Sequence, residues 1–211
     1  MMEAVVLGYG SIGKRHVANL EKLGVNVIGI HDPFRIVLPL HGELTAWNWV
    51  DKAAGRIVVV ASPTRFHAEH LRIALESGAA GVYLEKPPAC TAIELAEAVA
   101  RVGGAGNTRV AAGFNWRFSP LAEELREAPK KYGRFLRLSY LGADDITNWK
   151  GYGPGYYAID PIGGGALLTS LSHTVDLFLH IMGPGSFIHA SCGRDLAFGG
   201  VDTSWTIELF H

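Results

Sequence analysis

The sequence is poor in cysteine and nearly balanced in charge, and both features exclude classes of protein. Among 211 residues there are two cysteines, Cys90 and Cys192, in unrelated contexts. This argues against a disulfide framework or a paired-cysteine metal site, and it is typical of a reducing, cytoplasmic compartment. The formal net charge is −1, which argues against nucleic acid or an anionic membrane as a partner.

Long apolar runs are lacking as well. The best candidate for a membrane span, residues 163–183, is interrupted by His173, Asp176 and His180, and buried ionisable groups are costly in a bilayer. The N-terminus enters an apolar strand pattern at once, without the basic and then apolar order of a signal segment. We therefore expect a cytoplasmic protein without a targeting or transmembrane segment.

Glycine, in contrast, is abundant. The chain contains 26 glycines, well above the usual share of about 7%, which favours tight turns and close approaches of backbone to a ligand. Hydrophobic residues make up 48% of the chain and charged residues 18%. This balance is typical of a globular protein that buries a real core.

A glycine loop at residues 8–13 is the most informative stretch. An apolar run precedes it and a helical pattern follows it, so the order is strand, loop, helix. Gly8 permits the tight turn, Gly10 lets the backbone approach a pyrophosphate, and Gly13 lets the helix pack on the strand. With Ser11 and Ile12 at the helix start, these glycines form a predicted phosphate-binding site. The alternative is a glycine turn without a ligand.

An acidic residue supports the nucleotide interpretation. A second strand pattern, residues 25–30, ends just before Asp32, and this carboxylate has the spacing expected of a ribose ligand. Asp32 favours NAD because it would repel a 2′-phosphate. Lys14, Arg15 and Arg35 lie close enough in sequence to leave NADP possible.

Strand and helix patterns alternate through residue 112, and the pattern then changes. The alternation predicts an α/β fold in which an N-terminal Rossmann domain, a doubly wound parallel sheet over 1–118, precedes a smaller α+β domain with a mainly antiparallel sheet over 119–211. The strands are predicted at 4–7, 25–30, 56–61, 81–84, 108–113, 134–141, 187–191 and 203–210. The helices are predicted at 14–23, 66–77, 91–102, 121–128 and 166–182, with a long loop over 142–165. Thr91 and Glu94 have the spacing of a capping box at the start of the third helix. No full strand–helix pair is predicted over residues 34–54.

The turn Glu85-Lys86-Pro87 follows one of the predicted parallel strands. It should therefore lie at the carboxyl edge of the sheet, where open α/β sheets bind ligands. A lysine shielded there could have a lowered pKa and polarise or deprotonate a substrate hydroxyl. The alternative is a surface lysine beside a rigid proline turn.

Together these motifs resemble the Gfo/Idh/MocA family of sugar and cyclitol oxidoreductases, and the resemblance runs in order from the N-terminus to about Gly183. The motifs are the glycine loop with Lys14-Arg15-His16, Ala61-Ser62-Pro63-Thr64 followed by His67, Glu85-Lys86-Pro87, Gly113-Phe114-Asn115-Trp116-Arg117-Phe118, and Gly163-Gly164-Gly165-Ala166-Leu167-Leu168 followed by His173 and Asp176.

The resemblance implies an NAD(P)-dependent oxidoreductase that transfers a hydride between a nicotinamide cofactor and a carbinol or carbonyl of a sugar, cyclitol or sugar derivative. It implies catalytic roles for Lys86 and His173, and imidazole suits a base because its ordinary pKa lies near neutrality. The further cofactor-binding residues expected are Ser62, Pro63, Thr64, His67, Glu85, Lys86 and Asn115. The substrate-binding residues expected are Lys86, Arg117, Trp149, Tyr156, Thr169 and His173, with Asn115, Tyr157 and Asp160 as further candidates.

The helix predicted over 166–182 carries a polar stripe. Thr169, His173, Asp176 and His180 follow one another at steps of four, three and four residues, which places them on one helical face. Two structural alternatives stay open. The whole stripe could be a solvated helix face, and His173 could be a histidine at the edge of the core. A metal site lacks a further convincing ligand, so no metal is expected.

Two residues depart from the family pattern. Thr169 stands where the family usually carries an aspartate, and Leu171 stands where it commonly has a glycine. A threonine cannot relay a proton as a carboxylate does, so a non-catalytic nucleotide-binding sensor or partner subunit stays open as an alternative. A Rossmann methyltransferase is weaker, because it gives no role to the Lys86 turn.

The second domain is expected to be reduced or incomplete, since the chain ends partway through the sheet that the family uses for dimer contacts. An unpaired sheet edge favours association. We therefore expect a homo-oligomer formed through this sheet.

Overall fold

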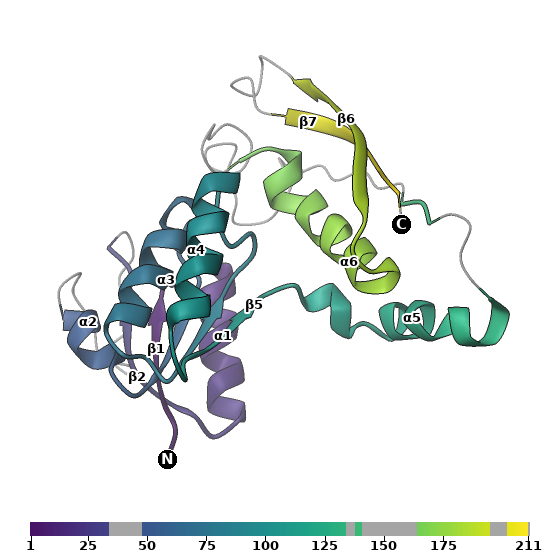
Figure 1. Cartoon of the computed structure of the whole chain (residues 1–211). Helices are drawn as coiled ribbons and strands as arrows, with labels where there is room; N and C mark the ends of the chain where they lie inside the picture. Colours follow the sequence, from purple (N-terminus) through teal and green to yellow (C-terminus); the bar gives the residue numbers. More distant parts are fainter. Residues whose placement is uncertain (34–47, 134–137, 141–163, 195–201, 211) are drawn as a thin grey trace. The chain divides into compact units, whose positions relative to one another are not determined.

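The computed structural model describes residues 1–33, 48–133, 138–140, 164–194 and 202–210 (Figure 1). The chain divides into two compact units, Met1–Gly113 and Phe114–His211. The predicted domain boundary after Phe118 lies inside the second unit and stays a prediction. Within the described part of the chain, no helix combines the length and the apolar character needed to cross a membrane.

The first unit is a parallel sheet with helices on both faces. Its five strands lie in the order β2-β1-β3-β4-β5, and every neighbouring pair is parallel. The strands are β1 (Glu3–Leu7), β2 (Asn26–His31), β3 (Ile57–Val60), β4 (Gly81–Leu84) and β5 (Arg109–Ala112). The helices are α1 (Ser11–Lys22), α2 (Asn48–Ala53), α3 (His67–Glu76) and α4 (Ala92–Gly104), with a 3₁₀ turn at Thr64–Phe66. The predicted doubly wound Rossmann sheet is confirmed.

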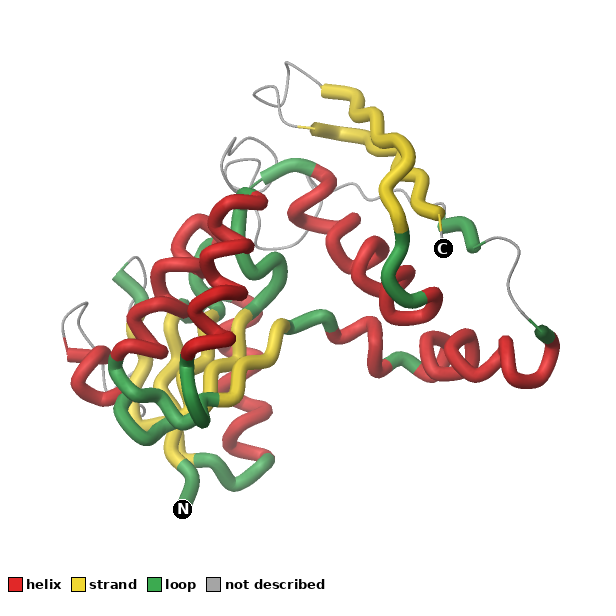
Figure 2. Tube along the Cα trace, viewed as in Figure 1, coloured by secondary structure: helices red, strands yellow, loops and turns green. Residues whose placement is uncertain are grey.

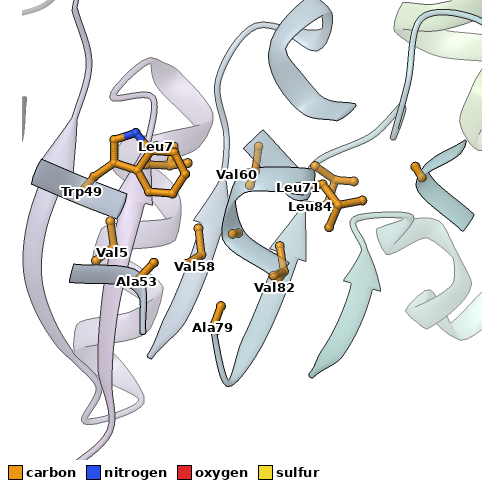
Figure 3. Packing of buried hydrophobic residues seen from close by; sticks show 12 residues of the cluster. Val5, Leu7, Trp49, Ala53, Val58, Val60, Leu71, Ala79, Val82 and Leu84 are labelled. Carbon is orange, nitrogen blue, oxygen red and sulfur yellow. The ribbon is translucent and has the colours of Figure 1, made fainter. Parts of the chain in front are cut away.

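Alternation along β1 explains why both faces are covered. Val5 and Leu7 belong to a core cluster that also includes buried side chains of α2, α3 and α4 (Figure 3). Val6, which points the opposite way, packs with Val17 of α1. Because successive strand residues face opposite sides, one apolar run can anchor helices on both. Figure 2 shows these helices around the central strands.

A local signal explains where α4 begins, whereas tertiary packing explains α2. Thr91 and Glu94 form the predicted capping box at the start of α4, with the Glu94 amide donating to Thr91 Oγ1 at 3.2 Å. The region without a predicted unit contains α2, whose Trp49 is 2% exposed. A six-residue helix has too few turns to show a clear period, so tertiary burial of Trp49 decides its conformation.

The second unit combines helices with an antiparallel strand pair. Its helices are α5 (Pro120–Tyr132) and α6 (Ser172–Met182), with a 3₁₀ turn at Asn115–Phe118 and a π-helical turn at Leu167–Leu171. Strands β6 (Ser186–Arg194) and β7 (Asp202–Phe210) pair antiparallel. The predicted α+β character with an antiparallel sheet is confirmed.

Helix α5 is longer than predicted. Ser119 caps its start by accepting from the Ala122 amide at 3.1 Å, and Pro120 occupies the first turn, where a missing N–H costs nothing. The helix also continues through Pro129, one residue beyond its predicted end. Of the strand predicted over 134–141, residues 138–140 are described and have no regular structure. The rest of that strand, and the loop over 142–163, lie outside the described residues.

A carboxylate from β7 anchors the start of the π-helical turn. Asp202 Oδ2 accepts from the Leu167 amide at 2.7 Å and from Trp205 Nε1 at 2.5 Å. Gly165 has φ +88°, and a Cβ at this position would collide with the Asp202 carboxylate. Glycine is therefore required here both by the backbone angle and by the carboxylate beside it.

Replacing Asp202 by alanine should destabilise the second unit. The change leaves the Leu167 amide and the Trp205 indole N–H without their acceptor, which should lower the free energy of unfolding by about 1–3 kcal/mol. Urea denaturation followed by tryptophan fluorescence measures the loss. Asp202→Asn keeps an oxygen acceptor and should recover part of it. The neighbouring variant Thr203→Ala, at an exposed position with a 3.4 Å hydrogen bond, is the control, and an equal loss in both alanine variants would contradict the anchoring role.

Candidate functional site

Two glycines of the 8–13 loop, Gly8 and Gly13, are required by the fold, whereas Gly10 faces open space. Gly8 has φ +95°, and the backbone of Ala61 and Ser62 occupies the space that its Cβ would need. A Cβ at Gly13 would collide with the carbonyl oxygen of Gly8. Gly10, in contrast, has nothing within 4 Å of a built Cβ. The loop is thus closed against the sheet at Gly8 and Gly13 and open outward at Gly10.

The open side of this loop suits an anion. Gly10 is the N-cap of α1 and offers no side-chain acceptor, and the first turn of the helix contains no acidic residue. Ser11 is exposed at the helix start. Unpaired N–H groups and the positive end of the helix dipole therefore face outward, as a diphosphate requires.

Asp32 lies beside the same loop. Its Oδ2 accepts from the Tyr9 amide at 2.7 Å, and the neighbouring residue His31 accepts from the Gly8 amide at 2.7 Å. The end of β2 is therefore tied to the glycine loop at two points. One face of the Asp32 carboxylate holds the loop in place, next to where a ribose would follow the diphosphate.

The parallel sheet brings the predicted cofactor residues of the first unit to one edge. Residues 8–13, Asp32, 61–64 and 85–87 each follow the end of a strand, and the carboxyl ends of parallel strands lie together. The order of the sheet puts β1 next to both β2 and β3, so the strand order reverses at this point, which is where open α/β sheets bind ligands.

Glu85 is held by a histidine of α1. His16 Nε2 lies 2.7 Å from Glu85 Oε1, and the Lys86 amide donates to Glu85 Oε2 at 3.2 Å. Burial raises the pKa of Glu85, but the hydrogen bonds and charges of His16 and Lys86 together outweigh burial, so this pKa lies below its ordinary value. Glu85 is therefore an acceptor with a set orientation, and Lys86 is attached to it through the backbone.

His67 is buried and bridges two loops. Its side chain is 2% exposed, with Nδ1 at 2.7 Å from the Pro87 carbonyl oxygen and Nε2 at 2.8 Å from the Ser62 carbonyl oxygen. Burial lowers the pKa of His67, and the two carbonyls raise it only in part. The His67 ring therefore lies between the backbones of both loops, and its predicted contact with cofactor stays a prediction.

A second histidine of α3 supports the same loop. His70 Nδ1 lies 2.9 Å from Ser62 Oγ, and the ring packs against Trp49 and Phe66. Burial lowers the pKa of His70 to about 4, with the charges of His31 and His67 adding to the effect. Of the remaining predicted loop residues, Thr64 is buried and Pro63 is partly exposed.

The second unit places His173 against aromatic rings. The imidazole stacks on Trp116 with ring centroids 5.0 Å apart and planes at 12°, and it meets Phe114 edge-on at 6.0 Å. The stacked contact and the edge-on contact together restrict the rotation of the ring. His173 is therefore oriented by residues from the turn that begins at Asn115.

Arg117, predicted to bind substrate, forms a bidentate ion pair within this unit. Its Nε donates to Asp176 Oδ2 at 2.7 Å, and its Nη2 donates to Asp176 Oδ1. The Asp176 side chain is 9% exposed. This pair joins the 3₁₀ turn to α6 and gives both side chains a scaffolding role.

Thr169 is turned into its own helix. It is 5% exposed, and its hydroxyl donates to the Gly165 carbonyl oxygen at 2.6 Å. The predicted polar stripe requires a regular α-helix. The π-helical turn that ends at Leu171 changes which helical face the residues before α6 occupy. Together with the burial of Asp176, this overturns the alternative of a solvated face.

Four of the predicted substrate residues belong to a part of the chain that the structure does not describe. Trp149, Tyr156, Tyr157 and Asp160 are outside the described residues. Among the described residues, no group of three or more histidine, cysteine, aspartate or glutamate side chains could hold a metal ion. His16, His70 and Trp116 were not assigned roles from the sequence, and the signal available for His16 was its place one helical turn after Gly13.

The chain is similar to several known dehydrogenases, although no protein-family model matches it. Over 131 residues, 60% of this chain, it is 31% identical to D-glucoside 3-dehydrogenase from Escherichia coli strain K12, and the match covers 36% of that protein. Myo-inositol 2-dehydrogenase from Lactobacillus plantarum matches 99% of this chain and 66% of its own with TM-score 0.79 at 20% identity. The WlbA dehydrogenase from Chromobactrium violaceum, solved with NADH and UDP-GlcNAcA, matches 91% of this chain and 58% of its own with TM-score 0.71 at 20% identity.

The chain has the fold of these solved dehydrogenases. This is the fold that the resemblance to the Gfo/Idh/MocA family implies, so the expectation is confirmed for the fold. The match covers 36% of the curated relative, and the chain spans less than two thirds of the length of either structure.

The stability of the first unit should fall as the pH drops below neutrality. Native His70 resists protonation down to about pH 4, whereas the unfolded residue accepts a proton near 6.5. Between these values the unfolded state binds more protons, so the free energy of unfolding should decrease by up to about 3 kcal/mol as the pH falls. Urea denaturation across this range measures the decrease.

The variant His70→Phe keeps an aromatic ring against Trp49 and Phe66 but removes the titrating group. It should flatten the pH dependence in part, because His67 is shifted in the same direction. His189→Gln, at an exposed position, is the control and should leave the slope unchanged. An identical slope in wild type and His70→Phe would show that His70 does not titrate as described.

Proposed function

We propose that the chain is an NAD(P)-dependent oxidoreductase that transfers a hydride between a nicotinamide cofactor and a carbinol or carbonyl of a sugar, cyclitol or sugar derivative. The observation that carries this proposal is the convergence of the open glycine loop, Asp32 and the Lys86 turn at one edge of the parallel sheet. The dehydrogenase names of the matched proteins support it.

The residues present fit a dinucleotide. The α1 N-terminus beside Gly10 would hold the diphosphate, since it combines open space with unpaired N–H groups. Asp32 would accept hydrogen bonds from the adenosine ribose and would disfavour a 2′-phosphate by charge repulsion, which favours NAD over NADP. The loops at Ser62–Thr64 and Glu85–Lys86 would line the nicotinamide end.

The proposed chemistry needs two proton-handling groups of this chain. When bound, the nicotinamide ring supplies the acceptor or donor of the hydride. Lys86 would polarise the substrate oxygen through its ammonium group, and the His173 imidazole would take or return the hydroxyl proton. The stacked position of His173 on Trp116 orients its ring nitrogens, as a base must be oriented to act.

Roles for the remaining substrate candidates differ in their support. The ion pair with Asp176 engages the Nε and Nη2 edge of the Arg117 guanidinium, so we propose that Arg117 acts mainly through the scaffold. Thr169 would line the site by its methyl group, because its hydroxyl bonds the backbone. Trp149 and Tyr156 stay proposed substrate contacts.

A second candidate function is a non-catalytic nucleotide-binding sensor or partner subunit. The observation that favours it is the inward hydrogen bond of Thr169, because no carboxylate stands at that position to hold a protonated His173. Asp176 does not replace it, since its carboxylate is bound by Arg117. Turnover measurements separate the two functions.

We further propose that copies of the chain associate through the β6–β7 sheet. In the described residues this sheet consists of a single antiparallel pair, and an isolated pair is marginal in water and offers unpaired backbone groups at its edges. A cytoplasmic location is proposed on the basis of the low cysteine content.

NADH should bind more tightly than NADPH, and binding should depend on Gly10. Energy transfer from the five tryptophans to the reduced nicotinamide measures both affinities. Gly10→Ala should weaken NADH binding about tenfold or more, because its methyl group fills the space where the diphosphate approaches, without disturbing the fold. Gly103→Ala of α4, an equally open position, is the control. Unchanged affinity in Gly10→Ala would mean that the loop does not hold the nucleotide.

Turnover should require His173. We expect NAD-linked oxidation of at least one member of a pool of sugars, sugar acids, cyclitols and nucleotide sugars, followed as NADH absorbance. His173→Asn should lower kcat by about 100-fold or more through loss of the base, with little change in NADH affinity. His180→Asn, on the same helix, should stay near wild type. NADH binding without any turnover would favour the sensor function.

A further inference from the structure

The two neighbours of Lys86 in the chain are each held by a histidine. His16 of α1 bonds the Glu85 carboxylate at 2.7 Å, and His67 of α3 bonds the Pro87 carbonyl oxygen at 2.7 Å. These helices pack on opposite faces of the sheet, since α1 and α3 contribute to different core clusters. The Lys86 turn is thus held by hydrogen bonds from helices on both faces of the sheet.

Both contacts are sheltered from water. The side chains of His16 and Glu85 are 18% and 15% exposed, and His67 is 2% exposed. Glu85 is confined further by Gly113, where an added Cβ would press on the Glu85 carboxylate and the Tyr83 hydroxyl. Charge-assisted or buried hydrogen bonds of this kind restrict their partners more than exposed ones do.

The histidines also connect the turn to the rest of the predicted cofactor site. His16 belongs to the helix that begins at the glycine loop, and the second nitrogen of His67 lies 2.8 Å from the Ser62 carbonyl oxygen. A displacement of either loop would therefore be transmitted to the residues that flank Lys86.

We propose that His16 and His67 are positioning residues that set the location and reactivity of the Lys86 amino group. They act through Glu85 and Pro87 and contact no substrate themselves. The catalytic significance of this arrangement rests on the proposed oxidoreductase function, whereas the effect on Lys86 itself does not. A displacement of about 1 Å at a catalytic group is enough to cost a large factor in rate.

The two contacts use different ring nitrogens, which permits a crossed set of substitutions. An asparagine amide nitrogen reproduces the position of histidine Nδ1, and a glutamine amide nitrogen reproduces that of Nε2. His67 holds Pro87 through Nδ1, and His16 holds Glu85 through Nε2. The proposal therefore expects asparagine to be the tolerated residue at position 67 and glutamine to be the tolerated residue at position 16.

The first readout is the rate at which an amine-acylating reagent modifies Lys86, measured by mass spectrometry of the Lys86 peptide in the full chain. His67→Gln and His16→Asn should change this rate by about threefold or more, because lysine reactivity follows its local environment. His67→Asn and His16→Gln should stay within about twofold of wild type. Thr108→Val, which removes a 2.8 Å hydrogen bond to Ala79 at the opposite edge of the sheet, is the control for simple destabilisation.

The second readout is kinetic. For a substrate found in the turnover screen, His67→Gln and His16→Asn should lower kcat by about tenfold or more, whereas NADH affinity should change little. Equal effects of asparagine and glutamine at both positions, or labelling rates that follow only the melting temperature, would overturn the proposal.

The two proposals can fail separately. A crossed labelling pattern in a protein without turnover would keep the positioning role and reject the enzyme. Turnover with an uncrossed labelling pattern would keep the enzyme and reject the positioning role.

Discussion

The close approach between the β1–α1 loop and the end of β3 is the contact on which the first unit depends. Gly8 turns with a positive φ against the backbone of Ala61 and Ser62, and the Gly8 carbonyl fills the space beside Gly13. This contact sets the start of α1, and with it the open N-terminus, the position of His16 and the bond from His16 to Glu85. A larger residue at either glycine would displace all of these together, because backbone cannot yield as a flexible side chain does.

In the second unit, polar side chains join elements instead of facing solvent. Asp202 anchors the helix start from a strand, and Asp176 joins α6 to the turn that carries Arg117. Buried carboxylates need such partners, since an unpaired buried charge is costly. The His173 ring is oriented by aromatic stacking on Trp116, so this unit presents one oriented imidazole on a scaffold of ion pairs and caps.

Periodic patterns predicted the sheet, its parallel direction, the capping box of α4 and most helix positions, because these depend on neighbours within a few residues. The predictions were incomplete where packing overrode local preference. Helix α2 forms around the burial of Trp49, and α5 continues through Pro129. The π-helical turn before α6 changes which residues share a helical face, and no rule of residue spacing predicts such a turn.

By itself, the sequence determined the fold class, the order of strand, glycine loop and helix, and which side chains gather at the carboxyl edge of the sheet. The reason is that strand and helix periods, turn residues and chain order are local properties. Only the tertiary structure decided the partners of the polar groups. His16 meets Glu85 across 69 residues, and Arg117 meets Asp176 across 59. A hydrogen bond requires its donor and acceptor to be positioned to within a few tenths of an ångström. Chain order alone does not set positions so closely.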